Sequence, residues 1–82
     1  MSEWKEQEQM LVDMIERQRK KLLDIARRIV PQATSDDVLQ PCDFPELETH
    51  PIFRYEEGLF EGLHTALTAL RALKKDHEHA SC

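Results

Sequence analysis

Side chains with metal-binding atoms gather at the C-terminal end of this 82-residue sequence. His77 and His79 flank Glu78, and Cys82 follows three residues later. This spacing differs from that of the paired ligands in a closed tetrahedral zinc site. The sequence therefore predicts no metal site and no cofactor. The segment over residues 76–82 is polar and terminal, which predicts a disordered tail.

A nucleophile and its base could be formed by Cys42 with His50 or His64. The sequence shows no third group that would orient the base, and it has no glycine-rich loop for a phosphate. A small helical enzyme would have to use Glu56, His64 and Arg71, which lie on or beside the polar side of a predicted helix and do not converge. We therefore expect a non-catalytic protein without a small-molecule substrate.

Arg17, Arg19, Lys20 and Lys21 form a basic run, and such residues bind nucleic-acid phosphates. Acidic residues flank the run, and no aromatic residues are interleaved with it. The net charge of −5 also opposes general binding to nucleic acids or to acidic membranes. A nucleic-acid-associated regulator is therefore the alternative function, and we rank nucleic acid below protein as a partner.

A long amphipathic helix over about residues 2–30 must position this basic run. Its apolar residues repeat at the heptad spacing of a coiled coil. They are Trp4, Leu11, Met14, Ile15, Leu22, Ile25, Ala26 and Ile29. Gln18 occupies a core position, where a polar residue can fix the register or can merely be tolerated. Pro31 ends the helix, because the residue before a proline avoids helical geometry.

A second helix over about residues 51–75 has apolar side chains around much of its circumference. One arc holds the large residues and one alanine: Ile52, Tyr55, Leu59, Phe60, Leu63, Ala66, Leu67, Leu70 and Leu73. A neighbouring strip holds small residues: Gly58, Gly62, Thr65, Ala69 and Ala72. A single helical neighbour covers one stripe, so the sequence predicts a second contact surface on this helix.

Gly58 and Gly62 are four residues apart and would let another backbone approach closely. That backbone is either the first helix or the connection of the same chain, or it belongs to a second chain. Glycine costs about 1 kcal/mol relative to alanine inside a helix, which weakens the helix unless a contact compensates. We expect a partner-binding surface made of Gly58, Phe60, Gly62, Leu63, Thr65, Ala69 and Ala72.

The connection over residues 31–50 contains several prolines and a capping signature, Thr34 to Asp37. This signature predicts one helical turn through Leu39. The apolar residues of the connection predict that it packs across an end of the helices, either as a lid or as a functional loop. Thr49 or His50 is expected to cap the second helix.

Charge predicts how the two helices pair. Residues 1–16 carry one basic and five acidic side chains, whereas residues 17–30 carry six basic and one acidic. An antiparallel hairpin brings the basic end of the first helix against Glu56, Glu57 and Glu61, and its acidic start against Lys74 and Lys75. Exposed ion pairs contribute only about 0–1 kcal/mol each, so they select this arrangement more than they stabilise it.

The sequence thus predicts one all-α domain over residues 1–82, an antiparallel two-helix hairpin that dimerises into a four-helix bundle. Two isolated cysteines fit a reducing compartment, and the polar N-terminus resembles no secretory signal. With no long apolar run, these features predict a soluble, cytoplasmic protein. As its function we predict a protein–protein interaction module, such as a small adaptor, a chaperone or a regulatory subunit.

Overall fold

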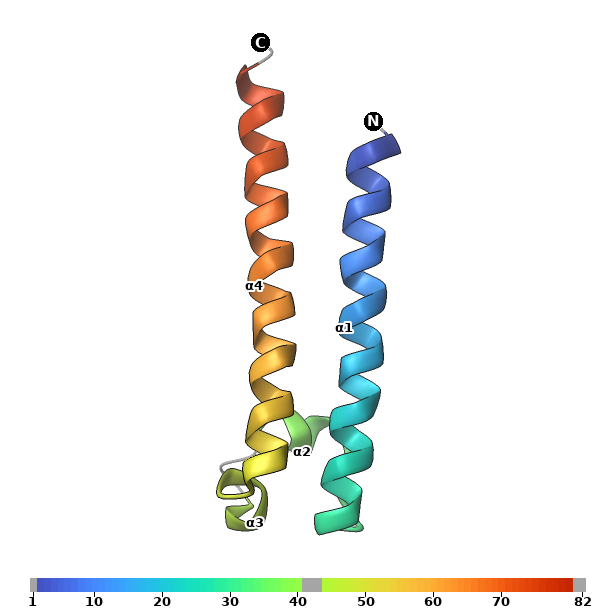
Figure 1. Cartoon of the computed structure of the whole chain (residues 1–82), viewed down its shortest axis with the longest axis vertical. Helices are drawn as coiled ribbons and strands as arrows, with labels where there is room; N and C mark the ends of the chain where they lie inside the picture. The colour runs from blue at the N-terminus through green and yellow to red at the C-terminus, as the bar shows by residue number, and fades with distance from the viewer. Residues whose placement is uncertain (1, 41–43, 81–82) are drawn as a thin grey trace.

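Two long helices, α1 (Ser2–Ile29) and α4 (Pro51–Ala80), lie side by side in opposite directions (Figure 1). The computed structural model describes residues 2–40 and 44–80. These residues form a rod of 51 × 19 × 19 Å, and none of them is in a strand. The predicted all-helical hairpin is therefore confirmed.

The connection contains two short helices, α2 (Ser35–Leu39) and α3 (Pro45–Glu48). The predicted turn is α2, which a capping box opens. The Asp37 N–H donates to Thr34 Oγ1 at 3.3 Å, and the Thr34 N–H donates to Asp37 Oδ2 at 2.9 Å. The sequence reading missed α3, whose first residue, Pro45, has a backbone angle suited to a helix start. Cys42 lies outside the described residues.

The last helix is longer than predicted. α4 continues to Ala80, so the expectation of a disordered tail from residue 76 is wrong for residues 76–80. This stretch contains no proline or glycine that would end a helix, and the His77 ring lies 5.6 Å from the ring of Trp4. At the other end, His50 caps α4 as expected, because its Nδ1 accepts a hydrogen bond from the Phe53 N–H at 3.5 Å.

The best-buried part of the core lies at the closed end of the hairpin, where the connection joins the helices. Its apolar members are Leu22, Ala26, Val30, Ala33, Val38, Leu47, Phe53 and Phe60, and Ile15 and Leu67 are buried farther along the rod. Val38 of α2 and Leu47 of α3 are 4% and 0% exposed, so the connection packs across this end as predicted. Arg27 Nε also donates to the Ala33 carbonyl at 3.0 Å and ties α1 to the connection.

The seam, meaning the line of contact between α1 and α4, follows a heptad on both helices. On α1 it holds Trp4, Glu8, Leu11, Ile15, Gln18, Leu22, Ile25 and Ile29, and on α4 it holds Phe53, Glu56, Phe60, Leu63, Leu67, Leu70 and Lys74; all are buried or half-buried. The seam of α1 was predicted. On α4 the predicted apolar arc is divided, because Phe53, which is 0% exposed, sets the face that turns inward.

Candidate protein-interaction surface

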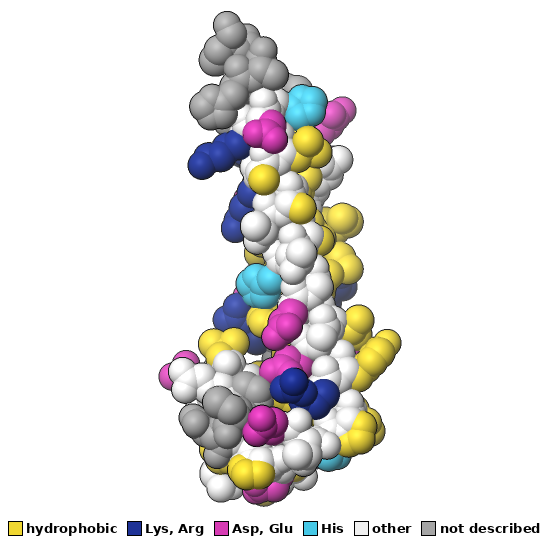
Figure 2. Space-filling view, turned by 90° about the vertical axis from the view of Figure 1, so that its left-hand side faces the viewer, with side chains coloured by type: hydrophobic (Ala, Val, Ile, Leu, Met, Phe, Trp, Pro, Cys, Tyr) yellow, Lys and Arg dark blue, Asp and Glu magenta, His cyan; other side chains and the backbone are white. Residues whose placement is uncertain are grey.

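A row of exposed apolar and small residues runs along α4 beside the seam. We call it the outer stripe, and its residues are Ile52, Tyr55, Leu59, Gly62, Ala66, Ala69 and Leu73; all seven are exposed. Their spacing alternates between three and four residues, so they form one continuous line on the helix. Figure 2 shows hydrophobic side chains along one edge of the molecule over most of its length.

The large side chains of the outer stripe are much more exposed than those of residues in a helical core. Tyr55 is 67% exposed, Ile52 60%, Leu73 50% and Leu59 42%. Single exposed apolar residues are common on protein surfaces, but a line of them along one helix marks a contact surface. The described part of the chain leaves this line uncovered.

One side of α1 extends the outer stripe. Each stripe residue immediately precedes a seam residue of α4, and Met10 and Met14 likewise precede the seam residues Leu11 and Ile15. Residues that immediately follow seam residues, such as Arg19 on α1 and Glu57 on α4, meet at the pocket on the other side of the hairpin. Met10, 55% exposed, and the half-buried Met14 therefore lie on the same side as the outer stripe.

The glycines of α4 have no close neighbour in the described structure. A Cβ placed on Gly58 or Gly62 would meet nothing within 4 Å. No atom of α1 or of the described part of the connection comes within 4 Å of these positions, so the interpretation in which the glycines admit α1 is wrong. Residues 41–43 of the connection lie outside the description, so a contact of the glycines with this part of the connection stays a prediction, as does the contact with a second chain.

The predicted partner-binding set is divided by the fold. Gly58, Gly62, Thr65, Ala69 and Ala72 are exposed, as a binding surface requires. Phe60 is 8% exposed and Leu63 is half-buried, because both belong to the seam. These two residues pack against α1 and are corrected to core residues. Ile52, Tyr55 and Leu73 were absent from the predicted set, although their heptad spacing was readable in the sequence.

A polar cluster interrupts the seam toward its closed end. Gln18 Nε2 donates to the Glu56 carbonyl oxygen at 2.9 Å and to Glu56 Oε1 at 2.8 Å. Lys21 Nζ lies 3.2 Å from Glu56 Oε2. The Gln18 amide, and then Lys21, hold the pKa of Glu56 below its ordinary value against the opposing effect of burial. Gln18 thus has a specific partner across the seam, which favours a register-fixing role over mere tolerance.

A second ion pair links the helices toward the open end. Arg71 Nε donates to Glu8 Oε2 at 2.8 Å, and this hydrogen bond lowers the pKa of Glu8. Together with the pair of Lys21 and Glu56, it confirms the charge pattern expected of an antiparallel hairpin. Of the expected residues, Glu56 meets the basic part of α1, whereas Glu57 pairs with Arg54 of its own helix. The acidic start of α1 pairs with Arg71 in place of the expected Lys74 or Lys75.

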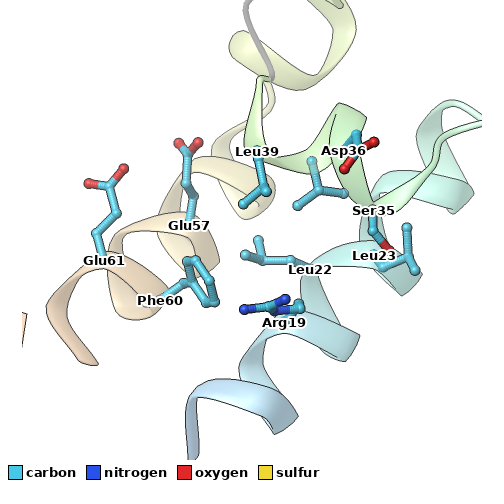
Figure 3. Close-up of a pocket in the computed structure, with 10 residues that line it drawn as sticks. Arg19, Leu22, Leu23, Ser35, Asp36, Leu39, Glu57, Phe60 and Glu61 are labelled. Atoms are coloured by element: carbon cyan, nitrogen blue, oxygen red, sulfur yellow. The ribbon is translucent and has the colours of Figure 1, made fainter. Parts of the chain in front are cut away.

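A pocket of about 150 Å³ lies between α1, α2 and α4 (Figure 3). Leu22, Val38 and Phe60 form its apolar floor, and Glu57 and Glu61 stand at its rim. Burial raises the pKa of Glu57, and the neighbouring Glu61 adds to this, although Arg54 lies 2.9 Å from the Glu57 carboxylate. Ser35 and Asp36 of α2 also line the pocket.

The basic run of α1 does not form a free cationic patch. Arg19 pairs with Glu16 at 3.7 Å and lies over the ring of Phe60, and Lys21 pairs with Glu56. Arg17 and Lys20 are exposed. Because two of the four predicted residues already have acidic partners, the geometry adds nothing to the nucleic-acid interpretation, which stays a prediction.

The residues whose side chains could take part in catalysis are spread along the rod. Glu56 belongs to the seam cluster, Arg71 pairs with Glu8, and His64 stacks edge-on against Phe60 at 4.7 Å. Among the described residues no cluster of His, Cys, Asp and Glu could hold a metal ion. Cys82 and the side chains of residues 78–80 lie outside the description.

Within the ranges 2–40 and 44–80, no helix combines the length and the apolar character needed to cross a membrane. Comparison with known proteins gave no match to a family model, to a curated protein or to a solved structure. The geometry of this chain is therefore the basis for its functional interpretation.

Proposed function

We propose that this chain is a non-catalytic protein–protein interaction module that associates through the outer stripe of α4, first of all with a second copy of itself. Two hairpins joined in this way would form a four-helix bundle. Two-fold dimers are the commonest soluble oligomers, and a bundle would cover apolar surface that a lone hairpin exposes. An adaptor, chaperone or regulatory role would follow from what the bundle presents to other proteins.

The observation that carries this proposal is the exposure of Tyr55, Ile52, Leu59 and Leu73 in one line. The line extends over 22 residues, from Ile52 to Leu73, or about 32 Å of helix at 1.5 Å per residue. Apolar side chains exposed singly at separate places would not indicate a contact surface. Here the chain has already used the best-buried face of α4 for its seam with α1, and the outer stripe adds a second apolar face.

Sedimentation velocity over a micromolar concentration range tests the proposal. The parent chain should sediment as a dimer, and Leu59→Glu should sediment as a monomer, because a charge on the stripe would have to be buried in the interface. Leu59 is 42% exposed in the hairpin, so the single chain tolerates this substitution.

Thr68→Glu is the matched control, because Thr68 is exposed on α4 and lies off the outer stripe. This variant should remain dimeric, and circular dichroism should show equal helix content in both variants. A parent chain that stays a compact monomer throughout the range would refute self-association. Equal effects of the two glutamates would refute the assignment of the surface.

A further inference from the structure

We infer that the second copy lies antiparallel across α4, with the two-fold axis beside Gly62. This inference rests on the proposed function and adds the orientation and register of the contact. Three observations support it: the order of large and small residues along the outer stripe, the distribution of charge along both helices, and the composition of the face that α1 presents on the same side.

The outer stripe is complementary to itself when it is reversed. Its large residues stand toward the ends, and its small residues follow Leu59. If one stripe runs against its copy with Gly62 facing Gly62, then Tyr55 faces Ala69 of the second copy and Leu59 faces Ala66. Ile52 faces Leu73 at each end. Between the two ends, Tyr55 and Leu59 thus meet small alanine side chains, which is how packed layers interdigitate, whereas two large residues meet at each end.

Gly62 lies where two such helices would cross most closely. It is exposed, and a Cβ at this position would meet nothing within 4 Å, so no described part of the chain requires a glycine here. A glycine at the crossing point lets two backbones approach beyond the distance that side chains allow. The antiparallel register gives this residue a role that the hairpin alone does not.

The charges of the two helices oppose the parallel arrangement. On α4, residues 51–62 carry one basic and three acidic side chains, whereas residues 63–76 carry three basic and one acidic. A parallel copy would set like charges against each other, and an antiparallel copy sets the acidic half against the basic half. The same holds for α1, whose charge changes sign between residues 16 and 17.

The proposed two-fold axis passes a matching point on each helix, Gly62 on α4 and about residue 17 on α1. Arg19 lies over Phe60, and Arg71 pairs with Glu8 farther along the rod. Interpolation between these contacts places Gly62 level with about residue 17 of α1. A two-fold axis at Gly62 therefore also passes α1 close to the point where the net charge of its sequence changes sign.

A third arrangement would place the outer stripe against α1 of the second copy. The residues of α1 on the stripe side, beyond Met14, are Arg17, Lys21, Asp24 and Arg28. This arrangement would cover Ile52, Tyr55 and Leu59 with charged side chains, and burying charges without partners is costly. The pairing of α4 with α4 covers the apolar stripe with apolar residues.

Disulfide trapping tests the register. Cys42 and Cys82 are first replaced by serine, and single cysteines are then introduced in place of Gly62, Ile52, Leu73 or Thr68. Under mild oxidation Gly62→Cys should link to itself across the axis, since a disulfide needs Cα atoms within about 7 Å. Ile52→Cys mixed with Leu73→Cys should give several-fold more linked dimer than either variant alone. Thr68→Cys is the control and should not link.

Sedimentation of the same variants separates the failure of the register from the failure of the proposed function. A dimer in which Ile52→Cys links to itself would overturn the antiparallel register in favour of a parallel one. A dimer in which neither Gly62→Cys nor the mixed pair links would overturn the register as well. A parent chain that is monomeric would overturn the proposed self-association together with this inference. Links through Gly62 and through the mixed pair would support it.

Discussion

Glu56 is the one charged residue among the buried residues that the structure describes. A buried carboxylate is tolerated when hydrogen bonds and an opposite charge satisfy it, and Gln18 and Lys21 supply both from α1. These contacts are formed only when α1 and α4 are aligned in this register. A slip by one heptad would bury the carboxylate without its donors, so the cluster selects the register that the apolar seam residues alone leave open.

We expect Gln18→Leu to destabilise the hairpin, because Glu56 then loses its amide donor while it stays buried. The double variant Gln18→Leu with Glu56→Leu should recover the parent stability or exceed it, since an apolar pair satisfies the seam. Urea unfolding of the parent, both single variants and the double variant gives the coupling between the residues. Additive effects would show that the two side chains act independently and that the cluster does not fix the register.

The carboxyl groups of Glu8 and Glu57 should respond oppositely to pH. The pKa of Glu8 is lowered in the fold, so its contribution to stability is complete above the unfolded value of about 4.3 and is lost as pH falls through the folded pKa. The pKa of Glu57 is raised, so its contribution is complete below that unfolded value and is lost as pH rises through the folded pKa.

Two glutamine variants test these signs by thermal unfolding at pH 7 and pH 3. Glu8→Gln should be less stable than the parent at pH 7, and the difference should narrow at pH 3. Glu57→Gln should be at least as stable as the parent at pH 7, and its advantage should shrink at pH 3, where the parent carboxyl is protonated. Identical pH profiles for the two variants would contradict the assignment of opposite shifts.

At the scale of the helices, α4 carries two apolar faces. The sequence showed that α4 has more apolar residues than one face needs, but it did not show which residue belongs to which face. The excess of apolar residues, the heptad of α1 and the capping box of α2 were all readable from spacing. The rotation of α4 was not, because it depends on Phe53 packing into the closed end with Leu47 and Val38. Those residues come from separate parts of the chain, and their meeting has no local signature. Phe60 was therefore placed on the binding surface although it lies in the seam.

The closed end should contribute more stability than the open end. We expect Phe53→Ala to cost about 3–5 kcal/mol of unfolding free energy, because the side chain is fully buried and its removal leaves a cavity. Ile52→Ala is the matched control, since Ile52 is the adjacent residue and is 60% exposed. Its cost in the monomer should be well below that of Phe53→Ala in urea unfolding. Similar costs would show that the closed end is packed less tightly than described.

The two glycines of α4 should weaken the isolated hairpin. Because a Cβ at Gly58 or Gly62 meets nothing within 4 Å, replacement by alanine should stabilise the monomer by about 1 kcal/mol at each position. The unfolding free energy should be measured in a Leu59→Glu background, where self-association is removed. The difference between variants then reports helix propensity alone. A loss of stability in that background would mean that another part of the same chain packs against the glycine.

At the scale of the whole molecule, the rod has a well-enclosed end and an open end. The connection adds a third layer over the closed end, whereas the helices beyond Phe60 have only each other. Leu11, Leu63 and Leu70 remain half-buried there, although they belong to the seam. Two helices enclose Ile15 and Leu67 there but not these three residues, so the open end gains most from a neighbouring chain.

This asymmetry predicts that stability depends on protein concentration. If folding and association are coupled, each tenfold rise in concentration adds about 1.4 kcal/mol per mole of dimer to the apparent stability. The midpoint of thermal unfolding should therefore rise with the concentration of the parent chain, and it should be independent of concentration for Leu59→Glu. Hydrogen exchange at high and low concentration would locate the effect. The amides of α4 beyond Phe60 should gain protection in the dimer, while those of the closed end should change little, because the single chain already encloses them. A midpoint that stays constant for the parent chain would show that the hairpin is stable without a second copy.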